Sequence, residues 1–185
     1  MNKTFYLNKL KEKILLLNKN FPKKNLVFSD GNKNAKIMII GEAPGRVENK
    51  LKIPFVGRAG KVLDRLLFSI SLDRQKVYIT NVVNYRPDKN RKPNLSEINL
   101  FKKYLFKHID IIKPKFILLL GSTAAQAVLG YQGPLNLIIG KFFEKKIINT
   151  TLKIMIIYHP AYLLRQPRKI KIVNKNLNTL KKYIK

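Results

Sequence analysis

Short apolar runs alternate with segments whose apolar residues recur at helical spacing. The β-branched and aliphatic runs predict buried strands, and the stripes of Ile, Leu and Val between them predict helices that cover a sheet. Because strands and helices alternate, the pattern favours a mostly parallel sheet with helices on both faces. The predicted strands are Lys36–Ile40, a β-branched strand within Val77–Val83 that ends near Asn81, Phe116–Leu120 and Ile154–Ile157.

The predicted helices fall between and around these strands. We expect a basic N-terminal helix, a helix with Ser96 as its candidate cap, and a basic terminal helix after two proline-containing boundary signals. The segment from Ile138 to Thr151 is typical of a hairpin, and Ser29-Asp30-Gly31 is typical of a turn within a loop that starts at Phe21-Pro22. The helical ranges are 1–20, 60–69, 96–112, 124–129 and the last part of 161–185.

Polar groups follow four of the predicted strands at their carboxyl ends. In an open parallel sheet these ends share one edge, where such folds place ligand chemistry. We therefore expect these side chains to converge on one site. They are Glu42, Asn81, Ser122 and His159.

The stretch from Ile37 to Asp64 organises the chain. A strand leads into the abrupt turn Gly41–Gly45, and a charged connection then reaches the tight segment Pro54–Gly57 ahead of the next helix. One interpretation is a ligand site with a carboxylate and a lone aromatic. The alternative is an ordinary strand-turn-helix with a solvated Glu42 and a core Phe55.

Composition narrows the classes further. A chain of 185 residues with 45% apolar content suits one domain, residues 1–185, with a real core. The absence of cysteine excludes disulfides and thiolate-bound metals or clusters. No apolar run approaches the roughly 20 residues that span a bilayer, and we expect the N-terminal segment to be a docking helix rather than a signal.

The charge balance is strongly positive. Thirty-eight Lys and Arg against 10 Asp and Glu give a net charge of +28, spread along the chain. This favours a polyanionic partner bound with salt-sensitive affinity. The alternative is mutational bias, because Lys greatly outnumbers Arg and both Asn and Ile are abundant.

Four blocks, in order, resemble the signatures of the family-four uracil-DNA glycosylases. They are GEAPGRVENKLKIPFVGRAGKVLD, NVVNYRPDKNRKPNLSEI, LLLGSTAAQAVLG and HPAYLLRQP, and the resemblance extends from about Leu26 to Pro167. It implies a three-layer α/β/α sandwich around a four-stranded parallel sheet. It also implies excision of uracil from DNA.

The resemblance departs from the family at its [4Fe–4S] cluster. The family's four cysteine positions fall near Asn20 and Phe21, at Tyr85 and at Phe101, and none is cysteine here. We therefore expect no cofactor and no metal. Apolar packing of the aromatic residues would fill the space of the cluster, with about 1.5–3 kcal/mol from each well-buried ring.

The resemblance also assigns roles in the pocket. It implies that Glu42 stabilises the sugar cation and orients water, that His159 donates to uracil O2 and that the Ala43 turn assists. Asn81 would select uracil and Phe55 would stack on the base, while Glu48 matches a family carboxylate of unassigned role. The alternatives are a surface Glu42, a capping His159, a strand-end cap at Asn81 and a core Phe55.

DNA contacts follow from the same blocks. The base must leave the duplex, and an apolar wedge from the last block would enter the stack. Leucines in helix core are the alternative to a wedge, and a plain N-cap is the alternative to a phosphate contact at Ser122 and Thr123. The candidate DNA-binding residues are Arg86, Asn90, Arg91, Ser122, Leu163, Leu164 and Arg165.

We expect a monofunctional glycosylase that releases uracil from single- and double-stranded DNA, leaves an abasic site and acts as a cytoplasmic, nucleoid-associated bacterial monomer without membrane contact. Two other functional classes are alternatives. A non-catalytic DNA-binding relative would keep salt-dependent binding without base release, but the retained Glu42, Asn81 and His159 argue against it. A phosphate- or nucleotide-binding enzyme fits less well, because GxGxxG and Walker motifs are absent.

Overall fold

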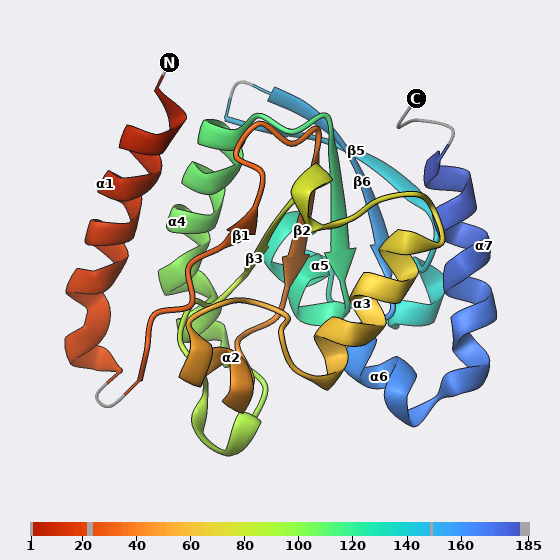
Figure 1. Cartoon of the computed structure of the whole chain (residues 1–185), viewed down its shortest axis with the longest axis horizontal. Helices are drawn as coiled ribbons and strands as arrows, with labels where there is room; N and C mark the ends of the chain where they lie inside the picture. Colours follow the sequence, from red (N-terminus) through yellow and green to blue (C-terminus); the bar gives the residue numbers. More distant parts are fainter. Residues whose placement is uncertain (1, 22–23, 149, 182–185) are drawn as a thin grey trace.

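The computed structural model describes residues 2–21, 24–148 and 150–181, which form one sheet covered by helices on both faces (Figure 1). Met1, Pro22 near the start of the predicted loop, and the end of the predicted terminal helix lie outside the described residues. The strands are β1 Asp30–Gly31, β2 Ile37–Gly41, β3 Val77–Asn81, β4 Phe116–Leu120, β5 Phe142–Ile147 and β6 Thr150–Ile157.

The sheet has the order β1-β3-β2-β4-β6-β5. Its four central strands, β3, β2, β4 and β6, are parallel, which confirms the predicted four-stranded core. Two antiparallel edge strands extend it. The predicted turn at Asp30-Gly31 pairs instead with β3, and the predicted hairpin forms from β5 and β6.

Helices cover both faces of the sheet. Two buried clusters separate the faces, one beneath α1, α4 and α5 and the other beneath α3, α6 and α7. The N-terminal α-helix is shorter than predicted, because the chain continues from Leu16 to Asn20 as a 3₁₀ helix. The helices are α1 Lys3–Leu15, α2 Arg46–Leu51, α3 Arg58–Phe68, α4 Leu95–Ile112, α5 Ser122–Leu129, α6 Pro160–Arg165 and α7 Ile170–Lys181.

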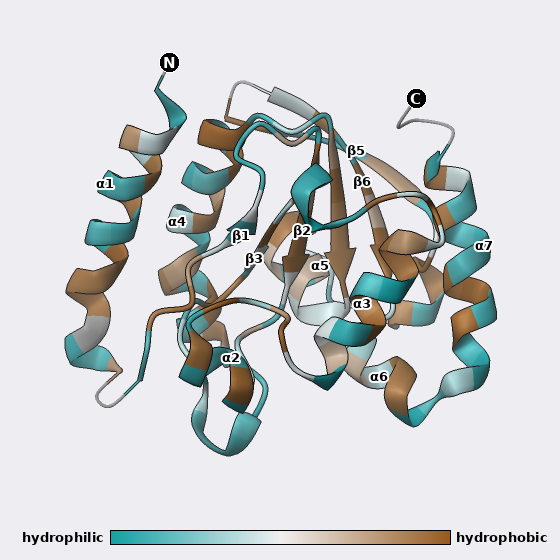
Figure 2. Cartoon of the chain, in the orientation of Figure 1, coloured by the Kyte–Doolittle hydropathy of each residue, from teal (hydrophilic) through white to brown (hydrophobic). Residues whose placement is uncertain are grey.

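The two innermost strands, β2 and β4, carry apolar residues along their length apart from Gly41 at the end of β2 (Figure 2). Successive side chains of a strand point to opposite faces, so β2 sends Met38 and Ile40 into one cluster and Ile37 and Ile39 into the other. Both faces are therefore buried, and this accounts for continuous rather than alternating hydrophobic runs.

Helix α4 begins two residues earlier than its candidate cap implied. Asn94, not Ser96, is the N-cap, since its side chain accepts the Glu97 N–H while the Glu97 carboxylate accepts the Asn94 N–H. This reciprocal capping box satisfies two backbone donors that the first helical turn leaves free. The cap at Asn94 marks the end of the loop that precedes α4.

Three aromatic rings tie the N-terminal segment to that loop and to α4. We call Phe21, Tyr85 and Phe101 the aromatic cluster. Phe21 stacks on Tyr85 with 4.8 Å between ring centroids, and Phe101 lies 5.5 Å and 6.1 Å from them. Tyr85 and Phe101 are fully buried, and the Tyr85 hydroxyl donates to the Ile14 carbonyl at 3.3 Å. Burial of these rings holds α1 against the rest of the fold.

Within the described part of the chain, no helix combines the length and the apolar content that crossing a bilayer requires.

Candidate active site

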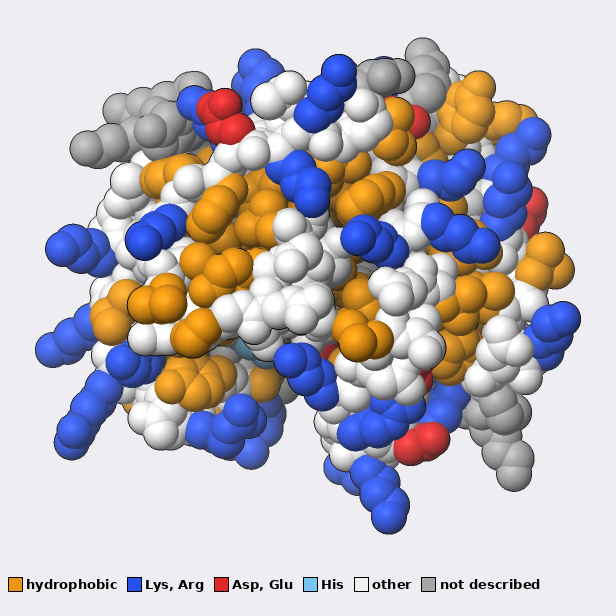
Figure 3. All heavy atoms as spheres, turned by 180° about the vertical axis from the view of Figure 1, so that it is seen from behind, with side chains coloured by type: hydrophobic (Ala, Val, Ile, Leu, Met, Phe, Trp, Pro, Cys, Tyr) orange, Lys and Arg blue, Asp and Glu red, His pale blue; other side chains and the backbone are white. Residues whose placement is uncertain are grey.

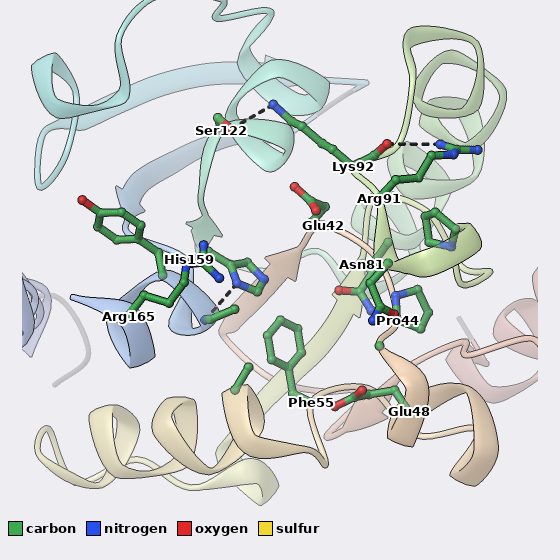
Figure 4. Close-up of a pocket in the computed structure, with 17 residues that line it drawn as sticks. Glu42, Pro44, Glu48, Phe55, Asn81, Arg91, Lys92, Ser122, His159 and Arg165 are labelled. Carbon is green, nitrogen blue, oxygen red and sulfur yellow. Dashed lines mark hydrogen bonds between the residues drawn. The ribbon is translucent and has the colours of Figure 1, made fainter. Parts of the chain in front are cut away.

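A cavity of about 580 Å³ opens at the carboxyl edge of the parallel strands (Figure 4). The residues after β2, β3, β4 and β6 meet there, because parallel neighbours end side by side. Most residues singled out from the sequence line it. These are Glu42, Ala43, Glu48, Phe55, Asn81, Asn90, Arg91, Ser122, His159 and Arg165.

Glu42 enters the cavity from the end of β2. One carboxylate oxygen, Oε2, accepts a hydrogen bond from the hydroxyl of Thr123 at 2.5 Å. Thr123 is fully buried in the first turn of α5, so its hydroxyl is not exposed to bulk water. This corrects the expectation that Thr123 suits a phosphate: its donor is directed to Glu42.

Asn81 ends β3 at the base of the cavity and is 2% exposed. Its Oδ1 is buried and finds no hydrogen-bond partner within the described residues. A buried acceptor without a partner costs roughly 1–3 kcal/mol, so it marks a place where a ligand donor fits. Gly41 makes room for it, since a Cβ there would lie 2.5 Å from Oδ1.

His159 follows β6 and is the N-cap residue of α6. Its Nδ1 accepts the Ala161 N–H at 3.1 Å, which leaves the ring proton on Nε2. Burial, assisted by the nearby Arg165 cation, lowers the pKa of His159 to about 4. The imidazole is therefore neutral at pH 7 and keeps one N–H donor. The capping alternative is correct for Nδ1 and leaves Nε2 available to a ligand.

Phe55 lies on the opposite side of the cavity from Glu42 (Figure 4), with its ring 5.8 Å from that of His159. Its backbone φ is +55°, a left-handed conformation that is uncommon for a non-glycine residue. Arg74 holds this segment, because its guanidinium donates to the carbonyls of Pro54 and Phe55. Arg74 is in turn bonded to Asp30 and Asp64, so the ring is supported from β1 and α3.

Glu48 lies on α2, a short helix that the charged connection did not predict. Its carboxylate is 9% exposed and accepts the Gly57 N–H at 2.7 Å. Because Gly57 is the N-cap of α3, this bond satisfies the backbone donor at the start of that helix and places a carboxylate at its N-terminal end. Glu48 thus fastens the segment that carries Phe55.

The loop before α4 supplies the cationic side of the cavity. Arg91 is held in a bidentate pair with Glu97, and the Lys92 ammonium donates to the Ser122 hydroxyl at 3.1 Å. Arg86 does not line the cavity; it donates to Asn90 at 2.7 Å and supports the loop from outside. The sequence interpretation missed Lys92, although its place between Arg91 and Pro93 was a signal.

The two leucines of α6 differ. Leu163 is 1% exposed and packs in the core beneath α3 and α7, so the expectation that it could serve as a wedge is wrong. Leu164 is 39% exposed, next in sequence to Arg165, which lines the cavity, and it remains available as a wedge. The segment is a short helix rather than the predicted loop. Successive residues of a helix face different directions, so Leu163 is buried while Leu164 is exposed.

Positive charge is spread over the surface. Figure 3 shows Lys and Arg side chains scattered over the back face among hydrophobic ones, with few acidic side chains. The charge therefore attracts polyanions without by itself indicating where they bind. The position of the cavity, and not the distribution of charge, indicates the binding site.

Comparison with known proteins agrees with this geometry. The family model for the uracil DNA glycosylase superfamily matches residues 28–185. This chain belongs to that superfamily. Type-4 uracil-DNA glycosylases of Pyrobaculum aerophilum and Archaeoglobus fulgidus are 39% and 40% identical to it, over 78% and 79% of this chain and 76% and 75% of those proteins. That of Sulfurisphaera tokodaii is 36% identical over 95% of this chain and 83% of its own length. The resemblance found in the four blocks is confirmed.

The iron–sulfur cluster associated with the type-4 resemblance does not fit this chain. A cluster of that kind is held by thiolates, and the chain has no cysteine. Phe21, Tyr85 and Phe101 pack their rings where the resemblance implies ligands. No group of three or more potential metal ligands occurs within the described residues.

Proposed function

We propose that this superfamily member is a monofunctional uracil-DNA glycosylase that hydrolyses the N-glycosidic bond of deoxyuridine in DNA. The observation that carries the proposal is the unpartnered Asn81 Oδ1, buried in a cavity that also holds Phe55, Glu42 and His159. Uracil presents an N3–H donor beside its O4 acceptor. An amide whose oxygen awaits a donor matches that pattern.

Asn81 provides selection between pyrimidines. Its Oδ1 accepts from uracil N3–H, and its amide donates to O4. Cytosine presents the reversed arrangement, with an acceptor at N3 and a donor at the exocyclic amine. Cytosine in this position would leave two buried polar groups unpaired, and such losses give strong discrimination.

Glu42 and His159 act on opposite charges of the transition state. Bond cleavage leaves a cation-like sugar and an anionic uracil, whose charge is shared between N1 and O2. Glu42 stabilises the sugar cation and orients the attacking water. Neutral His159 donates its Nε2–H to O2, and a backbone N–H at Ala43 adds to this preorganised stabilisation.

Phe55 stacks on the extruded ring, which reaches the cavity only after it leaves the base stack. Leu164, which is exposed and precedes the cavity residue Arg165, fills the gap that the base leaves, and Arg165 contacts the DNA backbone. A Leu164→Ala variant should lose more activity on duplex than on single-stranded DNA. Equal losses on both substrates would exclude the wedge.

The DNA backbone is bound by the cationic side of the cavity. Ser122 at the start of α5 and Lys92, Arg91 and Asn90 on the loop before α4 provide donors for phosphate, and Arg86 supports that loop. The protein acts on single- and double-stranded DNA as a monomer, in the cytoplasm with the nucleoid. Activity should fall steeply as salt increases.

The enzyme works without a resident metal or cluster. The aromatic cluster replaces the cross-link that thiolate ligation of iron would make between the N-terminal segment and the loop before α4. Iron analysis and visible absorption of pure protein test this. Stoichiometric iron with a broad visible band would contradict it.

A uracil-containing oligonucleotide, incubated with the protein and then cleaved by alkali at abasic sites, tests the function. We expect cleavage at the uracil without added metal and none at cytosine or thymine. Glu42→Gln, Asn81→Ala and His159→Ala should each slow release by about 10²–10³-fold while the protein stays folded. DNA binding without base release would instead indicate a non-catalytic relative.

A further inference from the structure

Glu42 is held by a neighbour that the proposed chemistry does not use. Strands β2 and β4 are parallel neighbours, with Ile40 paired to Leu119, so the segments that follow them lie side by side. Glu42 follows β2, and Thr123 stands in the first turn of the helix that follows β4. The hydroxyl of Thr123 reaches across, over 81 residues of sequence, to the Glu42 carboxylate.

This contact fixes one oxygen of the carboxylate and leaves the other free. Thr123 is fully buried and its hydroxyl has one proton, which is donated to Oε2. Oε1 has no hydrogen-bond partner within the described residues, and Glu42 lines the cavity. Oε2 is therefore held by the protein, whereas Oε1 is available to the substrate or to water.

The cations of the cavity explain why such an anchor is needed. Arg91, Lys92 and Arg165 line the same cavity as Glu42, and the Lys92 ammonium is bonded to Ser122, the residue before Thr123. A glutamate with free side-chain torsions would pair with one of these cations. Such a pair would move the carboxylate from the sugar and cancel its charge.

We propose that Thr123 is a positioning residue for catalysis: its hydroxyl holds the Glu42 carboxylate in the orientation that serves the sugar cation and the attacking water. Thr123 itself does not touch the substrate. The inference rests on the proposed glycosylase function. It extends that function to a residue whose place at a helix N-terminus would otherwise indicate only a cap or a phosphate contact.

Thr123→Val tests this, because valine keeps the shape of threonine and removes the hydroxyl. We expect kcat for uracil release to fall about 10- to 100-fold, the range for losing a hydrogen bond to a charged group, with KM little changed. Thr123→Ser keeps the hydroxyl and should retain most of the activity. If valine destabilises the fold, Thr123→Ala compared with Thr123→Ser gives the same contrast.

A double-mutant cycle separates positioning from a general structural effect. In a Glu42→Gln background, Thr123→Val should change kcat by less than about twofold, because the carboxylate through which it acts is gone. The matched control is Thr80→Val. Thr80 is also fully buried, but its hydroxyl donates to the Phe28 carbonyl at 2.7 Å, so its loss should lower stability and spare kcat.

Three results would overturn the inference: wild-type kcat in Thr123→Val, equal loss in Thr123→Val and Thr123→Ser, or effects of Thr123→Val and Glu42→Gln that multiply. Failure of the proposed function looks different. If Glu42→Gln is as active as wild type, or wild-type protein releases no uracil, the site assignment and the inference fall together. If Glu42→Gln is slow and Thr123→Val is not, only the inference is wrong.

Discussion

The aromatic cluster and the cavity both join segments that are distant in sequence, but they do so with opposite chemistry. In the aromatic cluster, rings pack face to face or tilted, and its hydroxyl has a partner in the Ile14 carbonyl. In the cavity, Asn81 Oδ1 is buried without a partner and Glu42 keeps one oxygen free.

This difference separates stability from chemistry. Groups whose interactions are complete inside the protein contribute to the free energy of folding. Groups left incomplete cost stability and become useful only when a substrate completes them. Variants in the two regions should therefore change different observables.

The largest effect on stability is expected for Phe101→Ala. Removing a fully buried ring from the aromatic cluster should lower the free energy of unfolding by about 3–5 kcal/mol, through lost transfer energy and the cavity left behind. Urea unfolding measures it, and uracil release at low temperature should stay near normal. Phe5→Ala, at a ring 49% exposed, is the control. Equal destabilisation by both would contradict a structural role for the cluster.

Asn81→Ala should lower activity and leave stability unchanged, the opposite of Phe101→Ala. We expect kcat/KM to fall about 10²–10³-fold, or about 2.7–4 kcal/mol of transition-state stabilisation. Stability should hold, because the variant removes an unsatisfied buried acceptor. Asn84→Ala is the matched control: Asn84 is equally buried, but its amide donates to the carbonyls of Val27 and Phe28. That variant should lose stability and keep turnover. If Asn81→Ala and Asn84→Ala changed activity and stability alike, the separation of catalytic from structural residues would be wrong.

Lowering the pH should reduce the free energy of unfolding through both histidines of the chain, His108 and His159. Burial lowers the pKa of His108 to about 3 and, with Arg165, that of His159 to about 4. Unfolded histidine titrates near 6.5, so the unfolded chain binds more protons between the two values. Each neutral histidine therefore contributes stability that is fully present above pH 6.5 and is lost as the pH falls toward its folded value.

The expected slope is about 1.4 kcal/mol per pH unit for each histidine, measured by urea unfolding across this window. His159→Gln should reduce this slope by about 1.4 kcal/mol per pH unit, because one titrating histidine is removed. Turnover of the wild-type enzyme should show no inflection near pH 6.5, because His159 stays neutral there. An inflection at that pH would mean that His159 titrates normally.

The smallest effect is expected for Tyr85→Phe. This variant keeps the ring in the aromatic cluster and removes only the hydroxyl that donates to Ile14. Thermal unfolding should show a loss of about 0.5–1.5 kcal/mol. A loss as large as that of Phe101→Ala would place the stability of the cluster in its hydrogen bond rather than in its packing.

Much of the fold was accessible from local pattern. The run Phe116–Leu120 is a strand as predicted, because a strand buried on both faces is largely apolar, and the β-branched run that starts at Val77 is a strand that ends at Asn81. The prediction was weaker where short polar segments fold only through long-range contacts. Asp30-Gly31 becomes a strand by pairing with β3, and α2 carries a buried Glu48 within a charged connection.

The arrangement of Glu42, Asn81 and His159 around one cavity followed from the residue types after three parallel strands, because parallel topology brings such ends to one edge. The missing cysteines were equally plain in the chain. Side-chain partners were not. Packing of the helices and strands decides which of Leu163 and Leu164 is buried. It also decides that Thr123 donates to Glu42 and that Arg74 donates to the Phe55 carbonyl. Local pattern encodes which residues are available, whereas packing decides which atoms they meet.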